Sequence, residues 1–294
     1  MTTSLHHADH SIGDLLARKG ETTVSVCLPA RDEAATVGPI VEVIVSELVG
    51  CGLVDELLVV DDHSSDGTAE VAAAAGAEVI GADEVLPDVT AGHGKGQALW
   101  KSLHASRGDL VVWCDADITD FDPCFVVGLL GPLLTDPTVE FVKGHYERAE
   151  RDGRGGGRVT ELVARPVLSL LFPHLSHIVQ PLSGEYAGRR GLLESLPFVK
   201  GYGVDLGLLI DIAARRGPEA IAQVDLGTRV HRNRTLAELS PQATAVLQVA
   251  LRRADPSLVP DVVALGLPGG DLVEVDGSEL PPLADLRAAS LGLV

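Results

Sequence analysis

The feature that most constrains the fold is an alternation of short apolar, β-branched runs with helical stretches along the first 145 residues. Five runs have the character of buried strands: 23–29, 54–62, 77–82, 108–117 and 139–144. The stretches between them have helical patterns: 34–49, 66–75, 96–106 and 123–134. Strands that are apolar on both faces and are separated by helices of about 10–15 residues indicate βαβ units. The pattern therefore predicts an α/β fold with a mostly parallel, Rossmann-like sheet and helices on both faces.

Beyond residue 145 the pattern is less regular. A segment rich in Gly and Arg, 148–158, predicts a loop. The last segment, 254–294, carries seven acidic residues against one basic residue and predicts a peripheral tail. Between these two segments the sequence predicts four helices and a late strand, in the order 159–172, 190–195, 205–216, strand 220–227 and 235–253.

The composition excludes several classes of function. With 23 basic and 42 acidic residues the chain has a net charge of −19, which repels nucleic acids. Aromatic residues make up only 3%, too few to stack single-stranded bases. No apolar run reaches the roughly 18 residues of a membrane span, and the start lacks the basic and apolar regions of a signal peptide. The four cysteines form no C-x-x-C pair and favour reduced thiols, so we expect a cytoplasmic protein.

Acidic residues follow three of the predicted strands. The first strand leads into Pro29-Ala30-Arg31-Asp32-Glu33, the second ends in Asp61-Asp62-His63-Ser64, and the fourth ends in Asp115-Ala116-Asp117. In an open parallel sheet, ligands bind beyond the carboxyl ends of the strands, so these segments form one candidate site. Such a set of acids is unsuited to a bare phosphate, and it favours a divalent cation together with a polyhydroxylated ligand. A second D-x-D, Asp120-Phe121-Asp122, precedes a proline and predicts a helix start.

The loops that usually bind nucleotides are missing. No G-x-G-x-x-G follows the first strand, which argues against a dinucleotide site. The segment around Gly94-Lys95-Gly96 resembles a P-loop only superficially. Val89 stands where the first P-loop glycine would be, and Gly96 replaces the Ser or Thr that holds the metal.

Three basic groups are candidates for binding anions. Lys95 begins a predicted helix, where a cation is disfavoured unless an anion lies nearby. Arg158 follows three glycines and opens the next helix, so a bidentate guanidinium and backbone N–H groups meet there. His231, Arg232 and Arg234 lie in a stretch without acids from Leu226 through Ala237. These groups suit a small phosphorylated or carboxylated substrate.

The motifs resemble those of a known family. The segments VSVCLPARDEAATVGPIV, LLVVDDHSSDGTAEVA and GKGQALWKSLHASRGDLVVWCDAD resemble the nucleotide-sugar half of GT-A glycosyltransferases. The later segments GGGRVTELVARPVL, QPLSGEYAGRR, LPFVKGYGVDLGLLID and AIAQVDLGTRVHRNRTLAEL resemble actinobacterial glucosyl-3-phosphoglycerate synthases. The resemblance runs from Val24 to Leu239. It implies a GT-A fold and a retaining transfer of glucose from UDP-glucose to the 2-hydroxyl of 3-phosphoglycerate, with Mg²⁺, Mn²⁺ or Co²⁺, in a homodimer.

The resemblance also implies residue roles. The donor nucleotide is expected to contact Pro29, Ala30, Arg31, Glu33, Ser64, Lys95, Asp115 and Ala116. The metal is expected to bind Asp117 and His231, and the acceptor to bind Gly157, Arg158, Thr160 and Asn233. The catalytic acids are expected to be Asp115, Asp117 and Glu185. A buried Glu185 paired with Arg189 or Arg190 is an alternative to that role.

The implied organisation is an N-terminal extension (1–22), a nucleotide-sugar-binding half (23–145), an acceptor-binding and metal-completing half (146–253) and an acidic C-terminal tail (254–294). Ala34 and the acidic segment 61–64 depart from the family pattern near the nucleotide base, so two donors stay open. UDP-glucose leads, and GDP-mannose, as in the related mannosyl-3-phosphoglycerate synthases, is the alternative. A binding protein without turnover is a further alternative. The sequence does not decide between front-face substitution and double displacement.

Overall fold

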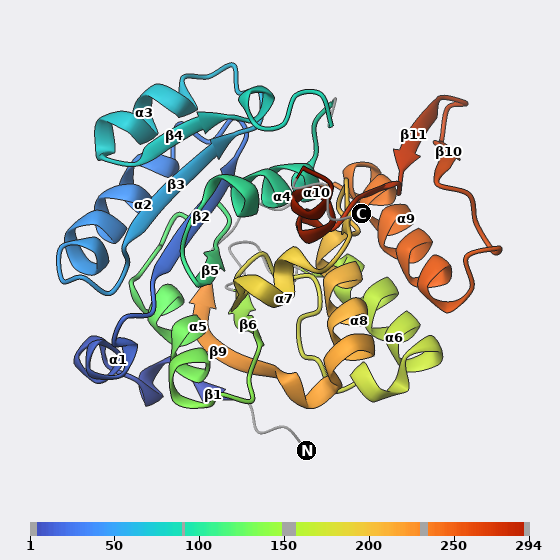
Figure 1. Ribbon diagram of the computed structural model, residues 1–294. Coiled ribbons are helices and arrows are strands. Elements are labelled where there is room, and N and C mark those ends of the chain that lie inside the picture. Colours follow the sequence, from blue (N-terminus) through green and yellow to red (C-terminus); the bar gives the residue numbers. More distant parts are fainter. Residues whose placement is uncertain (1–4, 90–91, 149–156, 230–234, 291–294) are drawn as a thin grey trace.

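An eight-stranded sheet forms the centre of the computed structural model, which describes residues 5–89, 92–148, 157–229 and 235–290 (Figure 1). Its strand order is β1-β9-β6-β7-β5-β2-β3-β4. The strands of this sheet are β1 Leu5–His6, β2 Val24–Ala30, β3 Glu56–Asp61, β4 Glu78–Gly81, β5 Leu110–Trp113, β6 Phe141–Arg148, β7 Tyr186–Arg189 and β9 Ile221–Arg229. The five early strands and the late strand expected from the sequence are thus confirmed.

One strand breaks the parallel order. β7 lies between β5 and β6 and runs antiparallel to both, whereas the other neighbouring pairs in the sheet are parallel. The strand was not expected from the sequence because its four residues, Tyr186–Arg189, show no alternation long enough to detect. An antiparallel strand places its amino end at the same sheet edge as the carboxyl ends of its neighbours.

Helices cover both faces of the sheet. The α-helices are α1 Ile12–Lys19, α2 Val37–Val43, α3 Thr68–Ala75, α4 Lys95–Ala105, α5 Cys124–Thr135, α6 Arg165–Leu171, α7 Arg190–Glu194, α8 Val204–Arg216, α9 Leu236–Ala254 and α10 Leu283–Ser290. The π-helical turns η2 Ile44–Val49 and η4 Thr160–Ala164 continue α2 and precede α6. Short 3₁₀ turns are η1 His7–Asp9, η3 Ala82–Glu84, η5 Pro173–Leu175 and η6 Pro218–Ala220. Among the described residues, no helix is both long and apolar enough to cross a membrane.

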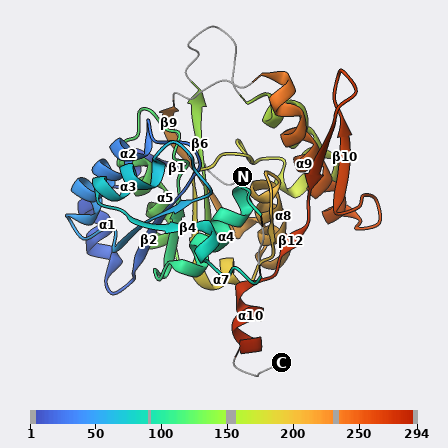
Figure 2. The same cartoon turned by 90° about the horizontal axis from the view of Figure 1, so that it is seen from above.

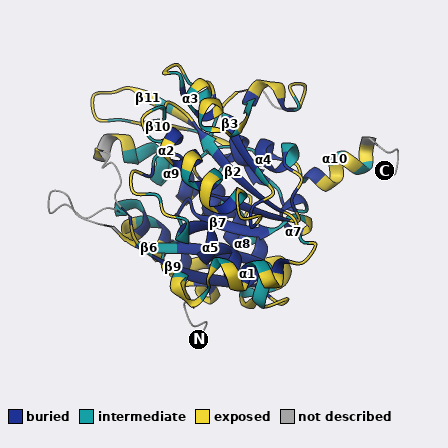
Figure 3. Cartoon of the chain, turned by 90° about the vertical axis from the view of Figure 1, so that its left-hand side faces the viewer, coloured by how far each residue is buried: buried dark blue, intermediate teal, exposed yellow. Residues whose placement is uncertain are grey.

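The period-two alternation of the strands creates two apolar cores. Along β2, Cys27 joins the core that packs against α4 and α8, while Val26 and Leu28 join the core that packs against α2 and α5. The central strands are therefore buried on both faces, as Figure 3 shows. This is the physical reason that their sequences read as continuous apolar runs.

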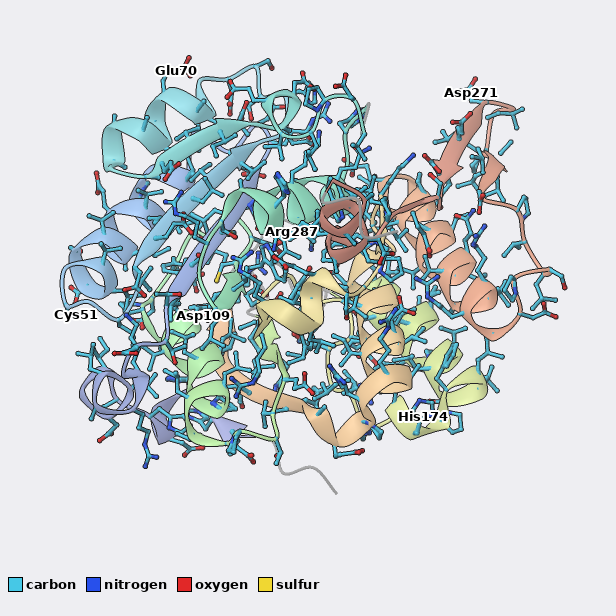
Figure 4. All side chains as sticks on the ribbon, in the orientation of Figure 1. Cys51, Glu70, Asp109, His174, Asp271 and Arg287 are labelled. Carbon is cyan, nitrogen blue, oxygen red and sulfur yellow. The ribbon has the colours of Figure 1, made fainter. Side chains whose placement is uncertain are left out.

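Both ends of the chain take part in the fold. The segment expected to be an extension contributes β1, which pairs with β9, and helix α1. The segment expected to be a peripheral tail forms the hairpin of β10 (Val262–Gly266) and β11 (Leu272–Asp276), then β12 (Glu279–Leu280). The hairpin and α10 lie at the periphery (Figure 2), and Asp271 marks the hairpin tip (Figure 4).

The tail is nevertheless not peripheral throughout. β12 pairs with β8 (Phe198–Val199), and Leu280 and Leu283 are buried in the core against α4 and α8. Trp100 of α4 donates its indole N–H to the carbonyl of Pro281 at 2.8 Å. Short apolar stretches within an acidic segment thus anchor it, which its overall composition did not reveal.

The beginning of α4 is packed directly against the backbone of β8. The amide of Gln97 donates to the carbonyl of Lys200 at 3.2 Å. A Cβ on Gly96 would lie 1.7 Å from the carbonyl oxygen of Val199, and a Cβ on Gly94 would lie 2.6 Å from that of Lys200. Only glycine allows this approach, which fixes the position of Lys95 between the two glycines.

This packing makes a stability prediction. Gly96→Ala forces β8 and α4 apart, and we expect it to lower the free energy of unfolding by about 1–3 kcal/mol, measured by urea denaturation. Gly191→Ala is the matched control, because Gly191 is also the second residue of a helix but has nothing within 4 Å of an added Cβ. The control should be neutral or gain up to about 1 kcal/mol from helix propensity. Equal stability of the two variants would contradict the packing argument.

Candidate active site

A pocket of about 360 Å³ opens at the carboxyl ends of the central strands. Its walls come from the ends of β2, β3 and β5 and from the start of α4, which is the edge where a parallel sheet binds ligands. The lining residues are Pro29, Ala30, Arg31, Asp32, Glu33, Asp62, Gly94, Lys95, Ala98, Asp115, Ala116, Asp117 and Tyr202. Of the eight residues expected to contact a donor nucleotide, seven therefore line one pocket. The eighth, Ser64, does not.

Ser64 has a supporting position instead. Its hydroxyl accepts a hydrogen bond from the amide of Asp32 at 2.9 Å, and the Asp32 carboxylate accepts one from the amide of Ser65 at 2.8 Å. The amide of Glu33 donates to the Thr68 hydroxyl at 2.8 Å. These bonds join the loop after β2 to the loop after β3. They hold Asp32 in the left-handed region, at φ 55°.

Lys95 is held between two carboxylates on one wall of the pocket. Its Nζ lies 3.1 Å from Oδ2 of Asp205 on α8 and 3.4 Å from Oδ1 of Asp115. Burial by itself lowers the pKa of Lys95, but Asp115 and Asp205 raise it well above its usual value. The amine is therefore a fixed cation in the wall of the pocket, held by two acids.

A buried arginine joins the two acids of the D-x-D to a third acid, Glu185. Arg229, at the end of β9, is 3% exposed. Its guanidinium donates to Oδ1 of Asp117 at 2.5 Å, to Oδ2 of Asp115 at 3.3 Å and to Oε1 of Glu185 at 2.5 Å. It also donates to the hydroxyl of Tyr146 at 2.8 Å. Although burial raises the pKa of Asp115, Lys95 and Arg229 together hold it below its usual value, so the carboxylate stays ionised.

Glu185 is completely buried and does not line the pocket. Its partner is Arg229, whereas Arg189 and Arg190 donate to backbone carbonyls of other segments. Burial raises the pKa of Glu185, with Asp115 adding to the rise and Arg229 opposing it. The alternative pairing with Arg189 or Arg190 is thus wrong, because Arg189 lies at the other end of β7 and Arg190 follows it. Glu185 anchors the arginine.

The loop before β7 packs on the first acid of the D-x-D. A side chain in place of Gly184 would collide with the carboxylate of Asp115 and displace it from its ion pairs. Lys143, 1% exposed, donates to the carbonyl of Ser183 at 2.8 Å, and the Ser183 hydroxyl donates to the carbonyl of Gly144 at 2.6 Å. Burial lowers the pKa of Lys143 to about 8. These contacts position the loop from within the core.

The donor set of the D-x-D suits a hard divalent cation. Asp115 and Asp117 present carboxylate oxygens beside the pocket, and such oxygens are the ligands that Mg²⁺ and Mn²⁺ prefer. Asp117 has the more exposed side chain, at 37% against 27% for Asp115. The other expected metal ligand, His231, lies outside the described residues. Within the described ranges no group of three or more His, Cys, Asp or Glu side chains is arranged around a metal position.

The residues expected to bind the acceptor are only partly described. Gly157, at φ 79°, accepts the amide of Glu161 and begins a helical stretch that includes Arg158 and Thr160. Thr160 is buried and Arg158 is partly buried. None of the three is among the described residues that line the pocket. Asn233, Arg232, Arg234 and the glycines before 157 lie outside the described residues.

Sequence reasoning missed three residues of the site: Tyr202 lines the pocket, Asp205 holds Lys95, and Arg229 holds the D-x-D. Asp62 belongs to one of the acidic segments expected at the site, but the sequence assigned it no role. Arg229 left the clearest signal, because it is a charged residue at the end of an apolar strand. Asp205 begins the predicted helix 205–216, where an acid is explained by its favourable interaction with the helix dipole.

Comparison with known proteins gives a consistent picture. Residues 25–178 match the family model described as glycosyl transferase family 2. The glucosyl-3-phosphoglycerate synthase of Mycolicibacterium smegmatis is 52% identical over 248 residues, covering 83% of this chain and 81% of that protein.

Two crystal structures of the Mycobacterium tuberculosis glucosyl-3-phosphoglycerate synthase are similar throughout. One, in complex with Mn²⁺, UDP-glucose and phosphoglyceric acid, is 46% identical with a TM-score of 0.89, and the match covers 98% of this chain and 99% of that one. Another, in complex with Mg²⁺ and UDP, is 46% identical with a TM-score of 0.86, covering 97% and 99% of the two chains. The structural similarity thus extends over nearly the whole chain.

The buried ion cluster makes its own prediction. Arg229→Met leaves Glu185 and the D-x-D without their cation, and we expect it to lower the free energy of unfolding by about 3–5 kcal/mol. The double variant Arg229→Met/Glu185→Met should recover much of that loss, because no buried charge at position 185 is then unpaired. Urea denaturation of the four proteins of this cycle measures both effects. A loss below about 1 kcal/mol in the single variant would contradict the stabilising role.

Proposed function

The chain belongs to glycosyl transferase family 2, among the glucosyl-3-phosphoglycerate synthases, and we propose that it transfers glucose from UDP-glucose to 3-phosphoglycerate. The products are glucosyl-3-phosphoglycerate and UDP. The observation that carries the proposal is the pocket that joins the D-x-D to the loop after β2 and to Lys95. The acids of such a pocket can bind a metal ion and the hydroxyl groups of a sugar. Its lysine can bind the diphosphate.

Within this pocket we assign the donor nucleotide to the residues expected from the sequence. Pro29, Ala30, Arg31 and Glu33 form the wall at the end of β2, and the ion pair of Lys95 with Asp115 forms another part of the wall. Ser64 acts indirectly, because its hydroxyl holds the loop that carries Asp32. From the segment 61–64, Asp62 lines the pocket, and Ser64 does not.

A divalent cation, Mg²⁺ or Mn²⁺, completes the donor site in this proposal. Its ligands are Asp117 and His231, with the diphosphate supplying further oxygens. When bound, the ion neutralises charge that develops on the departing UDP. Asp115 stays ionised between Lys95 and Arg229 and is suited to accept hydrogen bonds from sugar or ribose hydroxyls.

The acceptor is assigned to the start of η4. Gly157, Arg158 and Thr160 are proposed to bind the phosphate and carboxylate of 3-phosphoglycerate together with Asn233. A guanidinium binds both groups in bidentate geometry, and backbone N–H groups at the beginning of a helical stretch favour an anion. The acceptor's 2-hydroxyl is the proposed nucleophile.

For the stereochemistry we propose retention by front-face substitution. Double displacement needs a carboxylate that can reach the anomeric carbon. Glu185 is completely buried and bound to Arg229, and Asp205 is 4% exposed and bound to Lys95. Neither is suited to be a nucleophile, so the departing diphosphate is the proposed acceptor of the hydroxyl proton.

For assembly and compartment we propose a homodimer in the cytoplasm. Leu162 of η4 and Leu170 of α6 are 73% and 80% exposed, and α6 lies beside α9, whose Leu247 is 41% exposed. Exposed leucines in such a group favour burial against a second copy. All four cysteines are free thiols, which agrees with a reducing compartment.

The first test of the function concerns the metal site. With UDP-glucose, 3-phosphoglycerate and Mg²⁺ or Mn²⁺, we expect UDP release that EDTA abolishes. Asp117→Ala should reduce this release by more than about 99%, since one metal ligand is lost. Asp122→Ala removes an acid of the second D-x-D, at a helix start, and should retain most of the activity. GDP release from GDP-mannose instead would move the enzyme to the mannosyl alternative, and no release from either donor would overturn the proposal.

The second test concerns the acceptor. Arg158→Ala should raise the KM for 3-phosphoglycerate by about tenfold to hundredfold, because one charge-assisted contact is lost. The KM for UDP-glucose should change little. Arg165→Ala is the matched control, because Arg165 lies in the same helical stretch but pairs with Glu161 at the surface. Equal increases in the two KM values for Arg158→Ala would mean that the acceptor pocket lies elsewhere.

A further inference from the structure

A histidine beside the donor pocket bridges two acids. His63, two residues after the end of β3, has Nδ1 3.0 Å from Oδ1 of Asp62 and Nε2 2.9 Å from Oδ2 of Asp83 in η3. Nothing in the proposed reaction uses this residue. We propose that His63 is a pH-dependent positioning residue, whose imidazolium ties Asp62 to Asp83 and thereby sets the donor pocket for UDP-glucose. The inference rests on the proposed function of that pocket.

The geometry requires a charged ring. A neutral imidazole has one N–H, so it donates to one acceptor and presents a lone pair to the other. Here both ring nitrogens face carboxylate oxygens at hydrogen-bond distance, and only the imidazolium donates to both. The hydrogen bond to Asp62 raises the pKa of His63 above its ordinary 6.5; burial opposes this rise, and Asp83 adds to it.

Asp62 transmits the contact to the pocket. It is 5% exposed, and it lines the pocket beside Gly94 and Lys95. While Oδ1 faces His63, Oδ2 accepts the amide of Gly94 at 3.1 Å. One carboxylate thus joins the end of β3 to the beginning of α4. A rotation of Asp62 would release Gly94, which precedes the lysine that faces the D-x-D.

The backbone of His63 supports a positioning role. The residue lies in the left-handed region at φ 66°, where a non-glycine side chain is strained. The two ion pairs offset that strain while the ring is charged. Among the described residues, His93 also faces the ring of His63, besides Asp62 and Asp83, and the two ring centroids lie 6.3 Å apart.

The direction of the pH effect follows from the raised pKa. The bridge is complete at pH values below about 6.5, and it is lost as the pH rises through the higher pKa of folded His63. Loss of the proton turns one of the two contacts into a repulsion between lone pairs. The affinity for the donor should therefore fall with rising pH, without a matching change in the affinity for the acceptor.

The experiment measures the dissociation constant of UDP-glucose by calorimetry from pH 6 to pH 8.5, with Mn²⁺ present. UDP-glucose is preferable to UDP, because its diphosphate is esterified at both ends and does not titrate in this range. For the unmodified protein we expect the constant to rise by about threefold to tenfold across the range. His63→Asn tolerates the left-handed backbone and should show weaker binding with no such step. Asp83→Asn, at an exposed position, should move the step to lower pH.

The outcomes separate the two proposals. If the unmodified protein binds no UDP-glucose at any pH, the proposed function fails and this inference fails with it. If it binds, but His63→Asn reproduces the pH profile of the unmodified protein, the role of His63 is overturned and the proposed function stands. The KM for 3-phosphoglycerate is the internal control, because a general loss of structure would raise it too. Parallel increases in both constants for His63→Asn would likewise overturn a specific role at the donor pocket.

Discussion

The structure depends on one buried guanidinium. Three carboxyl groups, those of Asp115, Asp117 and Glu185, converge at one sheet edge, where they would repel one another without a cation. Arg229 satisfies all three because its planar fork presents several donors in fixed directions, which a lysine ammonium could not do. The residues involved come from the carboxyl ends of β5 and β9 and from the amino end of β7, with Tyr146 of β6 completing the set. Four adjacent strands are therefore joined at the site as well as by their ladders.

This arrangement explains why the sheet needs an antiparallel strand. The carboxyl ends of parallel strands meet at one edge of the sheet. If β7 were also parallel, the residues that follow it would lie at that edge, and the residues that precede it would not. Because β7 runs the other way, the residues before it, Gly184 and Glu185, reach the same edge. Gly184 then packs on Asp115, and Glu185 receives Arg229. The reversed strand thus supplies the site with an anchor from within the core.

The sequence predicted the parts of the structure that depend on local pattern. Apolar runs and helical periodicity located the central strands and the helices from α2 to α9, and the acids after β2 and β5 marked the correct sheet edge. Contacts between distant segments were not accessible in this way. The pairing of Glu185 with Arg229 spans 44 positions, and nothing in either neighbourhood specifies it. The prediction that 254–294 is a peripheral tail is wrong in part for a related reason. Its acidic composition is typical of the exposed hairpin, but the pairing of β12 with β8 brings Leu280 and Leu283 into the core.

The pairing of the acids with cations also explains how a chain of charge −19 would accommodate the anionic donor proposed above. The exposure of the three side chains rises from Glu185, which is fully buried, through Asp115 to Asp117. The two more buried acids are paired with cations, Glu185 with Arg229 and Asp115 with both Arg229 and Lys95. Asp117, the most exposed, is the acid that a hydrated cation can reach. A cation bound there lies near the fixed charge of Arg229, which opposes its binding until a further anion joins the site. The diphosphate of a sugar nucleotide is such an anion. Under the proposed function, the cluster would therefore favour joint binding of metal and nucleotide over the binding of either alone.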